Sequence, residues 1–309
     1  MRKKENGFDV PILLVFFKRF DTFKKVFDSV RRIKPKVLFL YQDGPRNNDD
    51  LAGINKCREL IEQIDWDCKI NTFFQTKNVG CDPSGFIAQS WFFSNVEYGI
   101  VLEDDCVPND SFFFFCEELL LKYKDCNNIA LISGFNLLDK HTDIKNPGSY
   151  FFTAHGGIWG WASWSRFYKL CDPSYSWLDD KKIVKRIKND FSNRLEARQF
   201  VELAKKRRQE NKAYFETILY AAARSHGMLE IVPSVNLISN IGFGPDGTHS
   251  DLNFKKLPPK TRKLFNKKTL ELEFPLVHPE TQKRDKKYEK TIEPKWYDPF
   301  VRLLYRIIG

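Results

Sequence analysis

The first half of the chain alternates short, almost continuous apolar runs with segments whose apolar residues recur every three or four positions. Such runs are typical of strands buried in a parallel sheet, and they occupy residues 10–17, 37–41, 69–74, 99–102 and 129–133. The segments between them have helical spacing, and they cover residues 21–32, 51–64, 84–95 and the stretch after residue 110, with Asp21 and Ser111 as the expected N-caps. This alternation predicts an α/β fold with a mostly parallel central sheet and helices on both faces.

The second half of the chain has a different pattern. Residues 150–166 hold three tryptophans and several glycines, and residues 181–224 have a helical and strongly basic pattern. Residues 230–235 predict a short strand, and residues 240–250 predict a mobile Gly-rich loop. Few patterns persist beyond Pro258, so we expect one continuous domain followed by an extension.

Three consecutive carboxylates, Glu103, Asp104 and Asp105, follow directly on the apolar run 99–102, and Pro108 then ends the strand pattern. Ligands of open α/β sheets bind at the carboxyl ends of the strands. Adjacent acids repel one another unless a positive charge lies between them, and a hard divalent cation that bridges to phosphate oxygens is the simplest occupant. The run therefore indicates an enzyme that acts on a phosphorylated, nucleotide-linked substrate; the alternative is a solvated acidic turn that binds nothing.

Composition narrows the class of protein. The 309 residues, 42% of them hydrophobic, suffice for one large α/β domain. Seven cysteines without CxxC or zinc spacing, and a charged N-terminus, favour reduced thiols and a cytoplasmic protein. No stretch approaches the ~20 apolar residues of a membrane span. The net charge of +10, concentrated in the C-terminal half, suits phosphates or lipid headgroups, whereas the lack of a nucleic-acid-binding motif disfavours nucleic acid.

Several segments, in chain order from residue 11 to residue 250, resemble glycosyltransferases of the GT-A fold. The chain is most similar to bacterial family-2-like enzymes, and it also resembles the metal-dependent N-acetylglucosaminyltransferases of the Golgi, which share a Glu-Asp-Asp motif. The matching segments are PILLVFFKR (11–19), QDGPR (42–46), NVG (78–80), GIVLEDDCVPNDSFFFF (99–115), ISGFN (132–136), GGIWGWASW (156–164) and VNLISNIGFGPDGTHS (235–250).

The resemblance implies a Rossmann-like GT-A catalytic domain over residues 1–255, with a nucleotide-sugar-binding part (1–135) and an acceptor-binding part (136–255). Residues 256–309 remain as a basic C-terminal extension. The implied reaction is the metal-dependent, inverting transfer of a hexose or N-acetylhexosamine from a nucleotide diphosphate donor, by expectation UDP-linked, to a glycan or lipid-linked glycan acceptor. The sugar, the acceptor, the linkage and the oligomeric state do not follow from the sequence.

The aromatic and cationic end of the extension suggests a peripheral contact with the inner face of the cytoplasmic membrane. A helix docked on the domain or at a dimer contact is an equally ordinary interpretation of that segment.

For the donor phosphates, the resemblance assigns Asp105 to a divalent cation, Mn²⁺ or Mg²⁺, that bridges the two phosphates. Asp104 is expected to orient ribose or sugar hydroxyls, and Glu103 to do the same or to brace a basic neighbour. His249 is a candidate further metal ligand, the alternative being a surface histidine in a flexible loop.

For the nucleoside, Asp43 ends the second strand, where its carboxylate can accept a hydrogen bond from the uracil N3–H or simply stabilise a turn. The planar guanidinium of Arg46 has N–H donors that can bind a phosphate or a nucleobase. Lys18 and Arg19 follow the first strand and Asn78 follows the third, so all three side chains can contact the nucleotide. The default interpretation is that they are loop side chains in solvent.

For the acceptor, Gly157 lets backbone amides approach a ligand, and the indoles of Trp159 and Trp161 can stack on apolar sugar faces. Either Trp159 or Trp161 is expected to border the acceptor cleft, and Trp164 is expected to be a core residue. The alternative is that all three tryptophans pack in the core.

An inverting transferase needs a general base within hydrogen-bond reach of the acceptor hydroxyl. The resemblance places it on a helix at a Trp-Asp pair, where this chain has Phe215 at the acidic position and Glu216 next to it. Glu216 is therefore the candidate base, with Asp180 and its neighbour Asp179 in reserve.

Two other functions remain open. A catalytically impaired nucleotide-sugar-binding or scaffold protein of the same fold would explain Phe215 at the expected acidic position. A sugar nucleotidyltransferase is disfavoured because residues 17–21 lack the glycines that hold a triphosphate.

Overall fold

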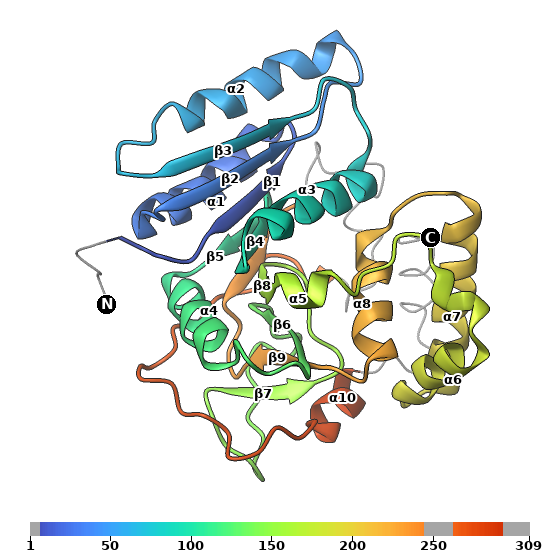
Figure 1. Ribbon diagram of the computed structural model, residues 1–309. Helices are drawn as coiled ribbons and strands as arrows, with labels where there is room; N and C mark the ends of the chain where they lie inside the picture. Colours follow the sequence, from blue (N-terminus) through green and yellow to red (C-terminus); the bar gives the residue numbers. More distant parts are fainter. Residues whose placement is uncertain (1–6, 244–261, 293–309) are drawn as a thin grey trace.

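The computed structural model of the protein describes residues 7–243 and 262–292. The central sheet contains the strands β1 (Ile12–Phe16), β2 (Val37–Gln42), β3 (Lys69–Phe74), β4 (Tyr98–Glu103), β6 (Ile129–Ser133), β7 (Tyr150–Thr153), β8 (Trp161–Trp164) and β9 (Leu229–Pro233). Their spatial order is β3-β2-β1-β4-β8-β6-β9-β7 (Figure 1). Neighbours pair in parallel except at β8 and β7, which run opposite to the other six strands. The predicted mostly parallel α/β sheet is confirmed.

Helices cover both faces of this sheet, as predicted. They are α1 (Phe20–Ile33), α2 (Leu51–Ile61) and α4 (Asp110–Lys122) on one face, and α3 (Cys81–Asn95), α5 (Ser165–Tyr168) and α8 (Phe215–Ser225) on the other. Because successive side chains of a strand point to opposite faces, β1 contributes to two cores. Ile12 and Leu14 pack under α1, whereas Leu13 packs under α3 and α8.

The basic helical region forms a lobe beside the sheet (Figure 1). In it, α6 (Lys181–Asp190) and α7 (Arg194–Gln209) share a core with α8 that includes Trp177, Ile187 and Phe200. Two short 3₁₀ helices, η1 (Asn48–Asp50) and η2 (Ser176–Asp179), precede α2 and α6. Within the described ranges, no helix is both long and apolar enough to cross a membrane.

The described part of the C-terminal extension packs into the domain. Helix α10 (Lys286–Ile292) lies against β7, and Arg284 forms a β-bridge with Phe152. Tyr288 and Glu289 are completely buried. This segment therefore belongs to the folded core, while the aromatic end of the extension lies outside the described residues.

Two local expectations at helix starts were wrong. Helix α4 begins at Asp110 and is capped by Asn109, whose side-chain oxygen accepts the Phe112 N–H, because Asn109 has the extended backbone of an N-cap. Ser111 therefore lies inside the helix, where its hydroxyl donates to Glu271. Helix α1 begins at Phe20, so Asp21 lies within its first turn.

The chain does not stop after the acid run. Asp104 and Asp105 form a turn into a short strand, β5 (Cys106–Pro108), which pairs antiparallel with β10 (Ile238–Asn240). This pair brings residues 240–243, part of the predicted Gly-rich loop, onto the acid run.

Candidate active site

The acid run lies at the carboxyl end of the parallel strands. Glu103 is the last residue of β4 and is paired in register with Val15 of β1. Because β1 and β4 are parallel neighbours, the loop after β1, which carries Arg19, lies beside Asp104 and Asp105. The edge where ligands of open α/β sheets bind is thus lined by these groups.

Arg19 binds two of the three acids. Its Nε donates to Asp104 Oδ2 over 3.2 Å, and its Nη2 donates to Asp104 Oδ1 and, over 2.9 Å, to Asp105 Oδ2. The side chains are nearly buried, with 14% of Arg19, 6% of Asp104 and 13% of Asp105 exposed. Burial alone would lower the pKa of Arg19, but the charges of Asp104 and Asp105 outweigh it and the net pKa is raised. Arg19, which the sequence predicts only as one of several nucleotide contacts, therefore supplies a fixed positive charge at the acid run.

Residues 240–242, at and just after the end of β10, enclose Asp105. The Ile241 N–H donates to the Asp105 backbone oxygen over 2.8 Å, and Asn240 Nδ2 lies 3.4 Å from Asp105 Oδ1. Gly242 sits so close that a Cβ on it would lie 1.9 Å from Asp105 Oδ2, while its carbonyl accepts from Arg19 Nη1 over 3.4 Å. Any other residue at this position would force the Asp105 carboxylate to move. His249, the predicted further metal ligand, lies outside the described residues.

The donor chemistry at Asp105 fits a hard divalent cation. Its side chain is 13% exposed and flanked by Glu103 and Asp104, and carboxylate oxygens are the ligands that Mg²⁺ and Mn²⁺ prefer. Within residues 7–243 and 262–292, no group of three Asp, Glu, His or Cys side chains could hold a metal ion by itself. A cation at Asp105 would therefore take most of its ligands from substrate oxygens and water.

Asp43 organises the loop between β3 and α3. Its Oδ1 accepts the N–H groups of Gly44 (2.8 Å) and Val79 (3.0 Å), and its Oδ2 accepts the Gly80 N–H (3.1 Å) and Asn78 Nδ2 (2.8 Å). Four donors occupy the carboxylate, which is 5% exposed. The structure therefore supports the turn-stabilising interpretation of Asp43, and Asn78 is part of the same loop network.

Lys18 and Arg46 share one buried partner that sequence reasoning missed. Arg46 donates from Nε and Nη2 to the two oxygens of Asp50, each over 2.8 Å, and Lys18 Nζ lies 2.7 Å from Asp50 Oδ1. The hydrogen bond from Arg46 is the main cause that holds the pKa of Asp50 well below its usual range, and burial only partly opposes it. Both cations are thereby anchored near the end of β2. No helical spacing signals this pair, because residues 43–47 are not helical and only residues 48–50 form a 3₁₀ turn.

The three tryptophans have different places. Trp161 and Trp164 are each 1% exposed, which confirms Trp164 as a core residue and excludes Trp161 as the border of a cleft. Trp161 is buried because it lies in β8, between β4 and β6. Trp159 is half-buried, edge-on to Phe135 at 4.8 Å between ring centroids, and it retains surface for a ligand. Gly157 packs on the same Phe135 ring, where a Cβ would lie 3.1 Å from it.

Glu216 lies in the first turn of α8 and is half-buried. The Phe215 ring packs against Gly85 of α3, where a Cβ would lie 2.5 Å from the ring, so the glycine allows the two helices to approach closely. Burial, with a smaller effect of the Asp82 charge, raises the pKa of Glu216 to about 7. Burial and the charges of Asp105 and then Glu216 raise the pKa of Glu103, so Glu216 is within electrostatic reach of the acid run.

The reserve candidates lie elsewhere in the helical lobe. Asp180 is exposed and caps α6, where its Oδ1 accepts the N–H groups of Lys182 (2.7 Å) and Ile183 (3.3 Å). Asp179 forms an ion pair with Arg208 on the surface. Both carboxylates thus have structural partners, whereas the charge of Glu216 acts on Glu103 of the acid run.

Comparison with known proteins finds distant likenesses among solved structures. No protein-family model and no curated protein matches the sequence. Among solved structures, apo UDP-glucose pyrophosphorylase is similar with a TM-score of 0.36 and 8% identity over 74% of this chain and 93% of that chain. UDP-glucose pyrophosphorylase complexed with UDP-glucose has a TM-score of 0.37 and 8% identity, over 74% of this chain and 91% of that chain. The apo structure of the bifunctional glycosyltransferase WbbM has a TM-score of 0.33 and 11% identity, over 85% of this chain and 45% of that chain. At these TM-scores neither a site nor an activity can be transferred to this chain.

Proposed function

We propose that this protein is a glycosyltransferase that moves a hexose or N-acetylhexosamine from a nucleotide diphosphate donor to a glycan or lipid-linked glycan, with inversion at the anomeric carbon. The observation that carries the proposal is the Arg19–Asp104–Asp105 cluster at the carboxyl edge of the parallel strands, next to Glu103, whose pKa the charge of Glu216 helps to raise. Such an edge is where this class of sheet binds nucleotides.

The donor side must stabilise a departing nucleoside diphosphate, whose phosphate oxygens gain negative charge in the transition state. Arg19 supplies a positive charge that its two carboxylate partners hold in place. Asp105 would hold a divalent cation, which when bound offsets the charge of the diphosphate as a Lewis acid. Gly242 keeps the backbone of residues 240–243 against Asp105, so that the carboxylate is already oriented before a donor arrives.

The acceptor side needs a base that takes the hydroxyl proton as the new glycosidic bond forms. Glu216 suits this role, because burial raises its pKa to about 7 and a general base is most effective when its pKa lies near the working pH. Phe215, which occupies the expected acidic position, is 5% exposed and packs on Gly85. The half-buried Glu216 beside it therefore takes the place of the acid in the proposed mechanism.

The proposal is tested by calorimetry of donor binding, with UDP-sugars and GDP-sugars, with and without Mn²⁺. Wild type and Asp105→Asn are compared, and Asp65→Asn serves as a matched control because Asp65 is an exposed carboxylate paired with Arg31. We expect one donor to bind in a metal-dependent way, to lose binding in Asp105→Asn and to keep it in Asp65→Asn. A folded protein that binds none of these nucleotides would show the proposal to be wrong.

A donor-binding protein is then incubated with glycan acceptors, and the product configuration is determined by NMR. Product with retained configuration would exclude Glu216 as the base of a single displacement. Binding without transfer to any acceptor would favour the impaired binding protein, and release of pyrophosphate from UTP and a sugar 1-phosphate would favour the nucleotidyltransferase.

A further inference from the structure

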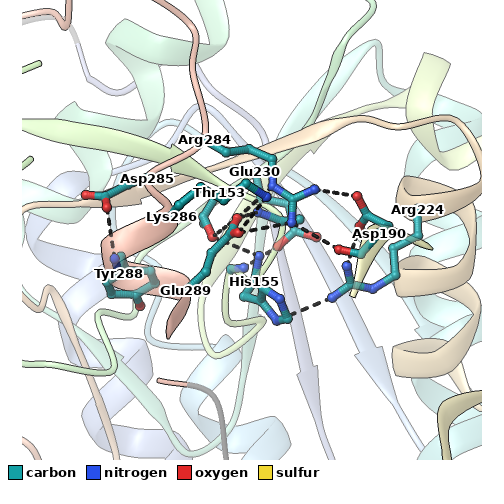
Figure 2. A network of polar contacts seen from close by, with 12 residues as sticks. Thr153, His155, Asp190, Arg224, Glu230, Arg284, Asp285, Lys286, Tyr288 and Glu289 are labelled. Atoms are coloured by element: carbon teal, nitrogen blue, oxygen red, sulfur yellow. Dashed lines mark hydrogen bonds and ion pairs between the residues drawn. The ribbon is translucent and has the colours of Figure 1, made fainter. Parts of the chain in front are cut away.

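A network of charged groups, buried at Glu289 and exposed at Lys286, joins the helical lobe, β7 and the C-terminal segment (Figure 2). Asp190, at the end of α6, binds Arg284 with one carboxylate oxygen and Arg224 of α8 with the other, the latter over 2.5 Å. Glu289 of α10 is fully buried and accepts from Arg284 Nε over 2.8 Å and from Lys286 Nζ over 3.1 Å. Burial would raise the pKa of Glu289, but the hydrogen bond from Arg284 is among the causes that lower it to about 2, so this carboxylate is ionised at neutral pH.

A cavity of about 340 Å³ lies against this network. Its lining is formed by the link between α6 and α7 and by the start of α10, namely Asn189, Asp190, Phe191, Ser192, Arg284, Lys286 and Lys290. Arg284 is held rigidly there, because it donates to Asp190 and Glu289 through all three guanidinium nitrogens. One wall of the cavity is therefore pre-organised by interactions that a ligand does not have to create.

Several donors around the cavity remain unused among the residues that the structure describes. Lys290, one helical turn after Lys286, forms no ion pair there, and the side chains of Asn189 and Ser192 make no hydrogen bond. Lys286 uses its ammonium on Glu289 alone. The cavity thus offers two ammonium groups, a hydroxyl and an amide to whatever enters it.

The charge around the cavity is positive. Its lining residues Arg284, Lys286 and Lys290 are cations, and Asp190 is an acid; together with Arg224 and Glu289, which pair with them, four cations face two acids. Helix α6 adds exposed lysines that form no ion pair within the described ranges, and these are Lys181, Lys182, Lys185 and Lys188. A one-sided positive field of this kind concentrates anions near the opening.

We propose that this cavity binds the phosphate group of a ligand, separately from the candidate active site. A phosphate carries about 1.5 to 2 negative charges at neutral pH and three strong acceptor oxygens, which match two ammonium groups beside a hydroxyl and an amide. The volume exceeds that of a lone phosphate and falls in the range of small-molecule sites, roughly 300–1,000 Å³, so it also admits part of the group that bears the phosphate. The inference does not rest on the proposed glycosyl transfer.

The test measures binding of inorganic phosphate by calorimetry at constant ionic strength, without divalent cations. Lys290→Gln is compared with Lys25→Gln, which removes an exposed lysine on α1 and serves as the matched control. We expect Lys290→Gln to weaken phosphate binding about tenfold, as the loss of a charge-assisted hydrogen bond does, and Lys25→Gln to leave it unchanged. If both variants weakened phosphate binding equally, the attraction would be diffuse, and if neither weakened it, phosphate would bind elsewhere. Either result would overturn the proposal.

Vesicles distinguish the two sources of a phosphate. Wild type and Lys290→Gln are sedimented with phosphatidylcholine vesicles and with vesicles of equal parts phosphatidylcholine and phosphatidic acid, whose headgroup is a phosphate monoester. Binding to the anionic vesicles that Lys290→Gln abolishes would identify a lipid headgroup as the ligand. Phosphate binding that depends on Lys290, with no Lys290-dependent vesicle binding, would identify a soluble phosphorylated ligand. A wild type that binds neither phosphate nor vesicles would refute the site.

Discussion

Replacement of Arg19 by methionine removes the positive charge that holds Asp104 and Asp105 together. Methionine keeps most of the apolar stem of the side chain, so the loss is chiefly that of the guanidinium. Removal of one partner from a buried ion pair costs about 3–5 kcal/mol, because the remaining charge stays buried without compensation. The two carboxylates are 6% and 13% exposed and can relax a little toward water. We therefore expect the free energy of unfolding to fall by about 3 kcal/mol, the lower end of that range.

A double-mutant cycle with Asp104→Asn isolates the pair. Asp104→Asn alone leaves Arg19 bound to Asp105 over 2.9 Å, so it should cost only about 1–2 kcal/mol. The double variant should lose about 2 kcal/mol less than the sum of the single variants, because no charge is then left unpaired at Asp104. Urea unfolding of all four proteins, in the presence of a chelator, gives the four free energies.

Arg32→Met is the matched control, because Arg32 is also an arginine of α1 and pairs with Asp110 on the surface. It should cost less than about 1 kcal/mol, as exposed ion pairs do. A coupling energy between Arg19 and Asp104 below about 0.5 kcal/mol, or a cost of Arg19→Met no larger than that of Arg32→Met, would refute the view that Arg19 anchors the site.

Three further predictions concern the same site. Glu216→Gln should abolish the rise of the transfer rate with pH near pH 7 while leaving donor affinity unchanged. The pKa of Glu216 in the folded protein lies above its ordinary value of 4.5, so ionisation destabilises the wild type as the pH rises from 4.5 to about 7. Above that window, urea unfolding should show Glu216→Gln to be the more stable protein. Gly242→Ala should weaken donor binding and destabilise the fold by about 1–3 kcal/mol, since its Cβ would meet Asp105 Oδ2; unchanged donor affinity by calorimetry would contradict this. Asp43→Ala should free four donors and accelerate hydrogen exchange at the Val79 amide, and an unaltered exchange rate would show that the loop is held by other contacts.

The alternation of apolar runs and helical segments predicted six of the eight strands of the sheet, because strand and helix periodicities are local properties of the sequence; β7 and β8 were not predicted. Local reasoning also placed the acid run correctly at the end of β4, since a buried parallel strand must be apolar and its polar continuation must lie at the sheet edge. It was wrong for Trp161, whose burial depends on β8 being inserted between β4 and β6, an arrangement that no local pattern encodes.

The tertiary structure alone decided which side chains meet. Arg19 and Asp104 are 85 residues apart in sequence, and Arg19 and Gly242 are 223 apart, so their contact depends on strand order and on the β5–β10 pair. The three N–H donors that residues 78–80 direct to Asp43, and the network around Arg284, likewise join distant segments. Composition and spacing identify groups that can carry charge or donate hydrogen bonds. Whether a given group binds a ligand or a neighbouring side chain depends on what the fold places beside it, because a buried charge must be compensated by the groups that the fold brings within reach.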